Sequence, residues 1–164
     1  MKDFTLHHEI ATDVDGFWKL FFDKDYNVAL YKKGLEFPGF ELVSMKETEK
    51  DITRTTKVTP KLDVPGPVAK LLGNGFAYTE EGTFDRAEKI WRWRNVPSDK
   101  LKTEGTVRVE PMGEGRVRRI GDIHVEGKIF GLSSVLESTL EKNLRHGWDR
   151  SAAFLNEWIA GKHR

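Results

Sequence analysis

Three charged residues, Arg54, Glu80 and Arg119, occupy alternate positions in runs whose other members are mainly apolar. Side chains alternate between the two faces of a strand, so each charge is expected on an inward, apolar face. An unpaired charge in an apolar interior costs several kcal/mol, and the three must therefore meet one another, water or a ligand. Two interpretations are open. The charges form an internal network of ion pairs, or the arginines anchor the carboxylate or phosphate of a ligand, because a planar guanidinium binds two oxygens at once.

The same residues offer one route to acid–base chemistry. Glu80 would act as a general acid if burial raised the pKa of its carboxyl group, with Tyr78 or His8 as a partner and Arg54 or Arg119 holding an oxyanion. Nearby arginines lower the pKa of a carboxyl group instead, and no spacing in the sequence demands this arrangement. An enzymatic role is therefore the weaker hypothesis, and no catalytic residue is assigned.

Two tryptophans one strand period apart, Trp91 and Trp93, face the side opposite Arg92 and Arg94. Core packing with a solvated basic edge explains the pattern, since tryptophan is highly buried on average. A tryptophan-lined pocket wall is the alternative. Stacking on nucleic-acid bases is disfavoured because 27 Lys and Arg balance 26 Asp and Glu, with no basic excess. No nucleic-acid partner is expected.

The lack of cysteine and the positions of the histidines argue against several classes of site. The chain has no cysteine, which rules out thiol chemistry, disulfides and thiolate metal sites. His7 and His8 point to opposite faces of one strand, and His124 shares a polar outer face with charged neighbours, so the histidines do not indicate a metal site. The sequence contains no phosphate-binding loop or dinucleotide fingerprint. No metal and no cofactor is expected.

A long helix is predicted at the end of the chain, from 131 to about 159. Apolar residues recur there at three- and four-residue steps and make one stripe. The stripe consists of Leu132, Val135, Leu136, Leu140, Leu144, Trp148, Ala152, Leu155 and Ile159. Such a helix is about 45 Å long at ~1.5 Å per residue, comparable to the whole domain, so it must lie across a sheet. Gly147 costs about 1 kcal/mol relative to alanine in mid-helix, and marks a bend, a close backbone approach or neither.

Strands fill most of the chain before that helix. A first strand ends near Ile10, and two short helices follow it, at 14–22 and about 25–34, the second with Gly34 as a left-handed stop. Further strands are predicted at 40–48, 50–60, 75–86, 88–96, 102–111 and 115–127, which makes about seven in all. Gly113 and Gly115 are expected to supply the positive φ of a tight hairpin turn.

The connection 61–74 is longer than the others and contains a Pro-Gly-Pro sequence. Its composition predicts a short helical turn that begins at the prolines and ends at Gly73. Apolar loops usually bury their side chains, so a plug on the core is favoured over a gate above a pocket. The residues that would form either are Val64, Val68, Leu71 and Leu72.

The first helix pair carries the pattern Trp18-x-x-Phe21-Phe22-Asp23 followed by Tyr26. This pattern, and the order of one strand, two short helices, about six strands and a long helix, resembles the START-like, or helix-grip, superfamily over the whole chain. The strand that contains Arg54 and ends at Pro60 is similar to that of a bacterial branch of unknown function. The resemblance implies an α+β fold in which a curved antiparallel sheet of about seven strands grips the long helix around a deep cavity.

Relatives of this kind carry lipids, sterols, polyketides or plant hormones, a few catalyse cyclisations or dehydrations, and others act on chaperones through their surfaces. The resemblance implies that the cavity is lined by Arg54, Tyr78, Glu80, Phe84, Trp91, Trp93, Arg119, Leu136, Leu140, Leu144 and Trp148. The leading hypothesis is that the protein binds or carries a hydrophobic small molecule that is lipid-, sterol- or polyketide-like. A cyclase or dehydratase and a surface interaction module are the alternatives, because a fold alone settles no function.

Length and hydropathy limit the number of domains and the kind of membrane association that can be expected. The 164 residues are expected to form one domain, 1–164. No run approaches the ~20 apolar residues of a membrane span, so a cytoplasmic protein without integral membrane association is expected, with transient membrane contact left open. The sequence does not determine an oligomeric state.

Overall fold

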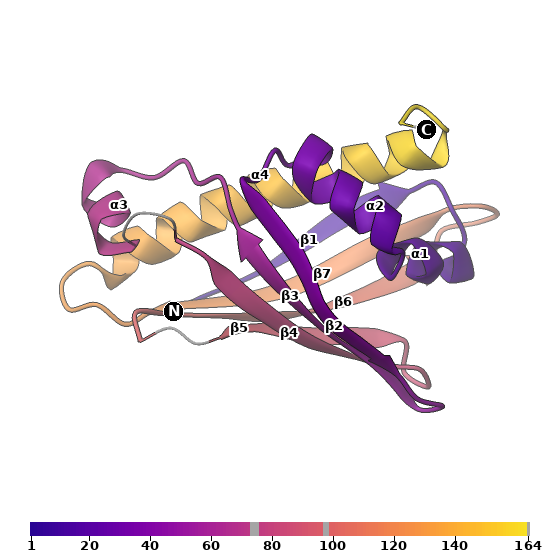
Figure 1. Cartoon of the computed structure of the whole chain (residues 1–164), viewed down its shortest axis with the longest axis horizontal. Coiled ribbons are helices and arrows are strands. Elements are labelled where there is room, and N and C mark those ends of the chain that lie inside the picture. Colours follow the sequence, from indigo (N-terminus) through magenta and orange to yellow (C-terminus); the bar gives the residue numbers. More distant parts are fainter. Residues whose placement is uncertain (73–75, 97–98, 164) are drawn as a thin grey trace.

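The protein was examined as a computed structural model that describes residues 1–72, 76–96 and 99–163. Within these residues, seven strands form one antiparallel sheet in the order β1-β7-β6-β5-β4-β3-β2, and the sheet curves around the long helix α4 (Figure 1). The predicted α+β architecture is confirmed. The elements are β1 (Lys2–Ile10), α1 (Val14–Phe21), α2 (Lys24–Ala29), the π-helical turn η1 (Leu30–Gly34), β2 (Gly39–Glu47), β3 (Asp51–Thr59), α3 (Gly66–Leu72), β4 (Tyr78–Asp85), β5 (Ile90–Val96), β6 (Leu101–Pro111), β7 (Val117–Gly127) and α4 (Ser133–Ile159).

The sheet is a meander except at one edge, where β1 pairs with β7, the last strand of the chain. The tight turn before β7 has the predicted geometry, with φ of 115° at Gly113 and 72° at Gly115. Alternate residues of β4, β5 and β6 face the space between the sheet and α4, as strand alternation predicted. Ile123 and Val125 of β7 and Val107 of β6 are buried members of this inward face.

Two capping aspartates begin the helices that follow β1. The carboxylate of Asp13 accepts a hydrogen bond from Gly16 N at 2.7 Å, and that of Asp23 accepts one from Tyr26 N at 2.8 Å. Each carboxylate satisfies a backbone donor that the first turn of a helix leaves free. The aromatic side chains of α1 and its C-cap pack against the sheet, edge-on between Phe21 and Trp91 and between Phe22 and Phe84, and tilted between Trp18 and Phe84.

The predicted left-handed stop at Gly34 is wrong. Gly34 ends the π-helical turn η1 with Leu35 N donating to Leu30 O at 2.7 Å, and the positive φ lies instead at Glu36, at 56°. The glycine is needed for space, because an added Cβ would lie 2.8 Å from the Phe154 ring of α4. Close approach of two elements, rather than backbone conformation, accounts for this glycine.

The apolar stripe of α4 faces the sheet over most of its length, with Leu136, Leu140 and Leu155 buried. Val135 is an exception, since 45% of its surface is exposed, and Phe154 takes a buried place that the stripe did not include. An added Cβ at Gly147 would meet nothing within 4 Å, so no close backbone approach explains that glycine. No helix in the described ranges is both long and apolar enough to cross a membrane.

Helix α3 lies beside the N-terminal end of α4 in Figure 1. Val68 is 1% exposed and belongs to the core, and Val64 and Leu72 pack against that core. This placement agrees with a plug. Gly73, the predicted end of the helical turn, lies outside the described residues, as does residue 75 at the predicted start of β4.

Candidate functional site

A cavity of about 570 Å³ lies between α4 and the inward face of the sheet. Its walls come from α1, α2 and η1 at one side, from strands β3 to β7 below, and from α4 above. Protein interiors normally contain few voids larger than a water molecule, so a space of this size is a feature of the fold rather than loose packing. Ligand pockets span roughly 300 to 1,000 Å³, a range that includes it.

Most of the residues expected to bind a ligand are brought together here. The cavity is lined by Arg54, Tyr78, Glu80, Trp91, Trp93, Arg119, Leu140, Leu144 and Trp148. Phe84 and Leu136 are not part of the lining in the described part of the chain: Phe84 packs on Trp18 at 4.4 Å between ring centroids, and Leu136 is fully buried. The ligand-binding role of the nine lining residues remains a prediction.

The four residues considered for a gate lie away from this space. Among the residues that the structure describes, the segment after β3 contributes Pro60, Lys61, Leu62 and Asp63 to the lining, but none of the four. The backbone of Asp63 is held to α4 by Asn143, whose side-chain amide accepts from Asp63 N at 3.0 Å and donates to Asp63 O at 2.8 Å. The segment at the rim is therefore tied directly to the helix.

The three inward charges do not form one ion-pair network. No ion pair within 4.0 Å joins any two of Arg54, Glu80 and Arg119, all three of which the structure describes. Each of the three charged side chains has a different environment. The sequence could not predict these differences, because all three occupy similar positions in the alternating pattern of their strands.

Both terminal nitrogens of Arg119, in β7, are hydrogen-bonded to other residues of the protein. Its Nη1 donates to Ser151 Oγ at 3.0 Å, and its Nη2 donates to the Trp148 carbonyl at 2.9 Å and lies 3.2 Å from His8 Nδ1. The guanidinium carbon also lies 4.6 Å from the centroid of the Trp148 ring, within cation–π range. Burial lowers the pKa of Arg119 to about 10, so the group stays charged at neutral pH and ties β7 to α4.

His8 continues that network to the surface. Since Nδ1 of His8 accepts from Arg119, the ring proton lies on Nε2, which donates to Asp149 Oδ1 at 2.7 Å. Burial lowers the pKa of His8 below its usual value, and the hydrogen bond to Asp149 opposes this only in part. The imidazole is therefore neutral at neutral pH, and the chain of contacts joins β1, β7 and α4.

Arg54 of β3 is surrounded by aromatic rings. Its Nη1 donates to the Phe21 carbonyl at 2.7 Å, and its guanidinium carbon lies 4.7 Å from the Phe21 ring centroid and 4.9 Å from that of Trp91. Burial lowers the pKa of Arg54, while the nearby Glu80 carboxyl group raises it. Stacking on desolvated rings is a stabilising environment for a guanidinium, although only Nη1 of Arg54 has a hydrogen-bond partner among the described residues.

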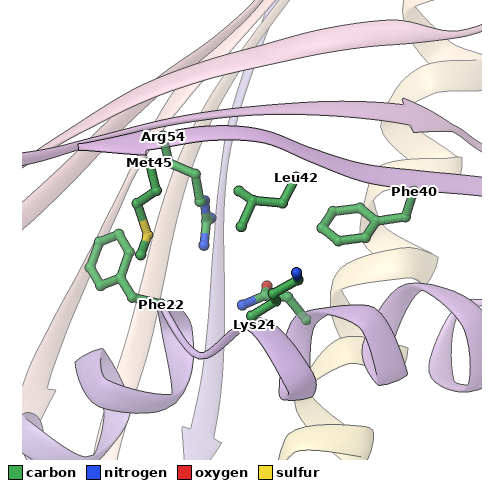
Figure 2. Close-up of a pocket in the computed structure, with 7 residues that line it drawn as sticks. Phe22, Lys24, Phe40, Leu42, Met45 and Arg54 are labelled. Carbon is green, nitrogen blue, oxygen red and sulfur yellow. The ribbon is translucent and has the colours of Figure 1, made fainter.

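A second, much smaller pocket lies on the other side of Arg54. Figure 2 shows the arginine between Leu42 and Met45 of β2, with Phe22 and Lys24 of the helical segment below it. The volume of this pocket is about 10 Å³. A space of that size holds about one water molecule and no organic ligand.

Glu80 of β4 is the least satisfied of the three charges. Its carboxyl group has no hydrogen-bond or ion-pair partner among the described residues, and it faces the cavity together with Tyr31 and Tyr78. Burial raises the pKa of Glu80, and the charge of Arg54 only partly offsets this. The result is a polar floor on which a carboxyl group and two phenols lie close to one another.

The two tryptophans of β5 are both core residues and cavity wall. Trp91 is 1% exposed and Trp93 is 8% exposed, and both line the cavity. Glycines on neighbouring strands make room for the rings: an added Cβ at Gly82 would overlap Trp91, and one at Gly105 would lie 2.9 Å from Trp93. Core packing and a pocket wall, the two interpretations of these tryptophans, are therefore compatible.

Several lining residues were not anticipated. Tyr31 reaches the cavity from η1, and Asn95, Thr103 and Ser151 also line it. Asn95 follows Trp91 and Trp93 at the same two-residue period, which is the signal that could have found it. Tyr31 carries no such signal, because the extra residue in a π-helical turn changes the direction of its side chains. No group of three His, Asp or Glu that could hold a metal ion occurs in the part of the chain that the structure describes.

Comparisons with solved structures support the fold. A protein from Thermus thermophilus is 17% identical, with a TM-score of 0.69 and coverage of 99% of this chain and 100% of that one. The Zhui aromatase/cyclase from a Streptomyces species is 14% identical, with a TM-score of 0.64 and coverage of 96% and 95%. A START superfamily protein from Mycobacterium smegmatis is 12% identical, with a TM-score of 0.62 and coverage of 95% and 98%. Identities this low show the fold alone, which is the predicted START-like, helix-grip fold.

Sequence comparisons show the family. No curated protein matches the chain. A family model described as a protein of unknown function, DUF2505, matches residues 5–159, which is nearly the whole chain. The chain therefore belongs to the DUF2505 family, a branch of unknown function with the START-like fold.

Proposed function

We propose that this protein binds and carries a hydrophobic small molecule in the cavity between α4 and the sheet. The observation that carries the proposal is the cavity itself, about 570 Å³ in volume with a largely aromatic and aliphatic lining. Apolar pockets with a few polar groups are the usual form of small-molecule sites. An aromatase/cyclase and a START superfamily protein share the fold, which is consistent with a site at this place.

The first measurement is a native mass spectrum of protein purified from its own host, repeated after denaturation and organic extraction. A discrete added mass at fixed stoichiometry supports carriage and identifies the molecule. The second measurement uses the fluorescent probe N-phenyl-1-naphthylamine and a cavity-filling variant, Leu140→Trp, because the indole would extend from α4 into the cavity. We expect a loss of affinity of at least tenfold.

The matched control is Val135→Trp, which adds the same ring to an exposed site on the same helix and should bind the probe as the wild type does. Leu144→Trp, at a partly buried lining position, replaces Leu140→Trp if that variant does not fold. Unchanged probe binding by a folded Leu140→Trp or Leu144→Trp protein would contradict the assigned position of the site.

A cyclase or dehydratase activity in the same cavity is a second candidate. The observation that favours it is the raised pKa of Glu80, which lies close to the phenol of Tyr78. A carboxylic acid whose pKa is raised suits general acid catalysis better than an ordinary one. Glu80→Gln should then abolish turnover of the extracted molecule and leave its affinity within about twofold, whereas unchanged turnover would exclude Glu80 as the acid.

A further inference from the structure

The side chain of Arg119 is held in the cavity wall by hydrogen bonds to two other elements. Its Nη1 donates to Ser151 Oγ and its Nη2 donates to the Trp148 carbonyl, both in α4. Nη2 also lies 3.2 Å from Nδ1 of His8, in β1. The buried Nε has no partner in the part of the chain that the structure describes. The position of this charged wall residue therefore depends on three hydrogen bonds, one of which ends on a histidine.

The contact between Arg119 and His8 requires a neutral imidazole. A guanidinium only donates hydrogen bonds, so Nδ1 of His8 must present its lone pair and the ring proton must lie on Nε2. That proton points to Asp149 Oδ1, which is 2.7 Å from Nε2. A second proton, on Nδ1, would bring two donors and two positive charges face to face across 3.2 Å. Protonation of His8 is therefore incompatible with the observed position of Arg119.

The surroundings of His8 determine which side chain moves when the ring is protonated. The charged and titratable groups that act on it are Arg119 from β7, Asp149 from α4 and His7, its neighbour on β1. An imidazolium binds a carboxylate more strongly than a neutral ring does, so protonation strengthens the contact with Asp149 and retains the ring. Arg119 is hydrogen-bonded only to neutral acceptors, so its guanidinium is the group that is displaced.

Displacement of Arg119 would change the cavity. Arg119 and Trp148 both line it, and the guanidinium carbon lies 4.6 Å from the centroid of the Trp148 ring. Since β1 and α4 hold the guanidinium from their sides and β7 carries it, the space open to a displaced guanidinium is the cavity. A cation in an apolar space keeps water around it, because its desolvation is unfavourable. Both the cation and its water would weaken the binding of an uncharged apolar ligand.

We infer that His8 is a proton-controlled switch on the cavity: neutral His8 holds Arg119 in the wall, and protonated His8 releases it into the space of the ligand. The inference rests on the proposed binding function and adds its regulation. The side chain of His8 is 13% exposed beside the exposed Asp149, so a proton can reach it from solvent. Ligand affinity therefore falls in mildly acidic solution, and because coupling between two sites is reciprocal, ligand binding disfavours protonation of His8.

The test is the affinity for N-phenyl-1-naphthylamine, which carries no charge between pH 7.5 and 5. We expect the wild type to lose at least about fivefold over this range, the lower end of the usual coupling between two sites. The matched variant is His8→Asn, because the asparagine Oδ1 takes the place of Nδ1 as an acceptor and does not titrate. His8→Asn should lose less than about twofold. Near-UV circular dichroism confirms that both proteins stay folded over the range.

The control is His7→Gln, which changes the exposed neighbour on the opposite face of β1 and should keep the full pH dependence. If His8→Asn does not fold, Arg119→Met replaces it, because that variant removes the displaced group and should also lose the pH dependence. A second readout is the imidazole nitrogen NMR spectrum of the wild type. The midpoint of the His8 titration should fall by at least about 0.7 pH unit when the probe saturates the protein, which is the same fivefold coupling.

The outcomes separate this inference from the proposed function. Probe affinity that does not change with pH in the wild type would overturn the switch and leave hydrophobic binding intact. Equal pH dependence in the wild type and His8→Asn would also overturn it, and would assign the effect to another lining group such as Glu80 or His146. Tighter binding at pH 5 would contradict the displacement of Arg119 into the cavity. Binding of no probe at any pH, together with bare protein from the host, would overturn both proposals.

Discussion

Substitutions at Gly147 of α4 allow the stability of the fold and the binding of a ligand in the cavity to be tested separately. This glycine lies in the interior of a 27-residue helix, lines the cavity, and has no atom within 4 Å of the place that a Cβ would take. Glycine in a helix interior costs about 1 kcal/mol relative to alanine. Gly147→Ala should therefore raise the free energy of unfolding by about 1 kcal/mol, because the gain in helix propensity meets no steric penalty.

The assay is urea denaturation, in which the midpoint should rise while the slope m stays constant. For a chain of this size the gain corresponds to an increase in Tm of about 2–4 °C. Gly147→Leu should be about as stable as Gly147→Ala, since the two residues have similar helix propensities, but its side chain would extend into the cavity. Affinity for N-phenyl-1-naphthylamine should fall about tenfold in the leucine variant and stay within twofold in the alanine variant.

Both substitutions at Gly147 should thus raise the free energy of unfolding, whereas only Gly147→Leu should weaken probe binding. Destabilisation by Gly147→Ala would refute the reasoning, because it would require a neighbouring atom that the surroundings of Gly147 do not contain. Unchanged binding by a folded Gly147→Leu protein would show that this end of the cavity does not hold the probe. Either result would be decisive without any knowledge of the natural ligand.

Two further substitutions test the attachment of α4 to the sheet. Gly121→Ala should lower the free energy of unfolding by about 1–3 kcal/mol, because the added methyl overlaps the Trp148 ring; Gly66→Ala, which meets nothing within 4 Å, is the control in the same urea assay. The pKa of His8 is lowered in the folded protein, so the unfolded state binds more protons below about pH 6.5 and stability should fall as the pH falls through that region. His8→Gln should flatten the pH dependence of Tm between pH 7.5 and 5, whereas the exposed neighbour His7→Gln should retain it, and a slope equally steep in both variants would contradict the assignment to His8.

The architecture could be predicted because it depends on periodicity. Strand alternation and the three- and four-residue steps of α4 placed nearly every element within a few residues of its observed bounds. The two helices after β1 begin at Asp13 and Asp23, whose side chains act locally as caps, so their predicted starts of 14 and about 25 lie close to the observed ones. Gly34 was misassigned because a glycine that makes space for a distant ring looks the same in sequence as one with positive φ.

The candidate site could be predicted only in part, because it depends on contacts between residues far apart in the chain. Alternation shows that Arg54, Glu80 and Arg119 point inward, but whether a charge is satisfied depends on residues far away in the chain. The two terminal nitrogens of Arg119 find partners in α4, about thirty residues later, and in His8, 111 residues earlier, whereas its buried Nε has none. Asn95 continues the two-residue period of Trp91 and Trp93, but its position opposite Glu80 depends on the register of β4 against β5, which no local pattern fixes.

The size of the cavity explains why polar groups belong in it. A dry void of about 570 Å³ would cost about 14 kcal/mol at ~24 cal/mol per Å³, which is comparable to the whole stability of a typical domain. The space must therefore be occupied, and the polar floor formed by Glu80, Tyr31 and Tyr78 allows water to occupy it when no ligand is bound. A ligand must then offer these groups a hydrogen bond as good as that of the water it displaces.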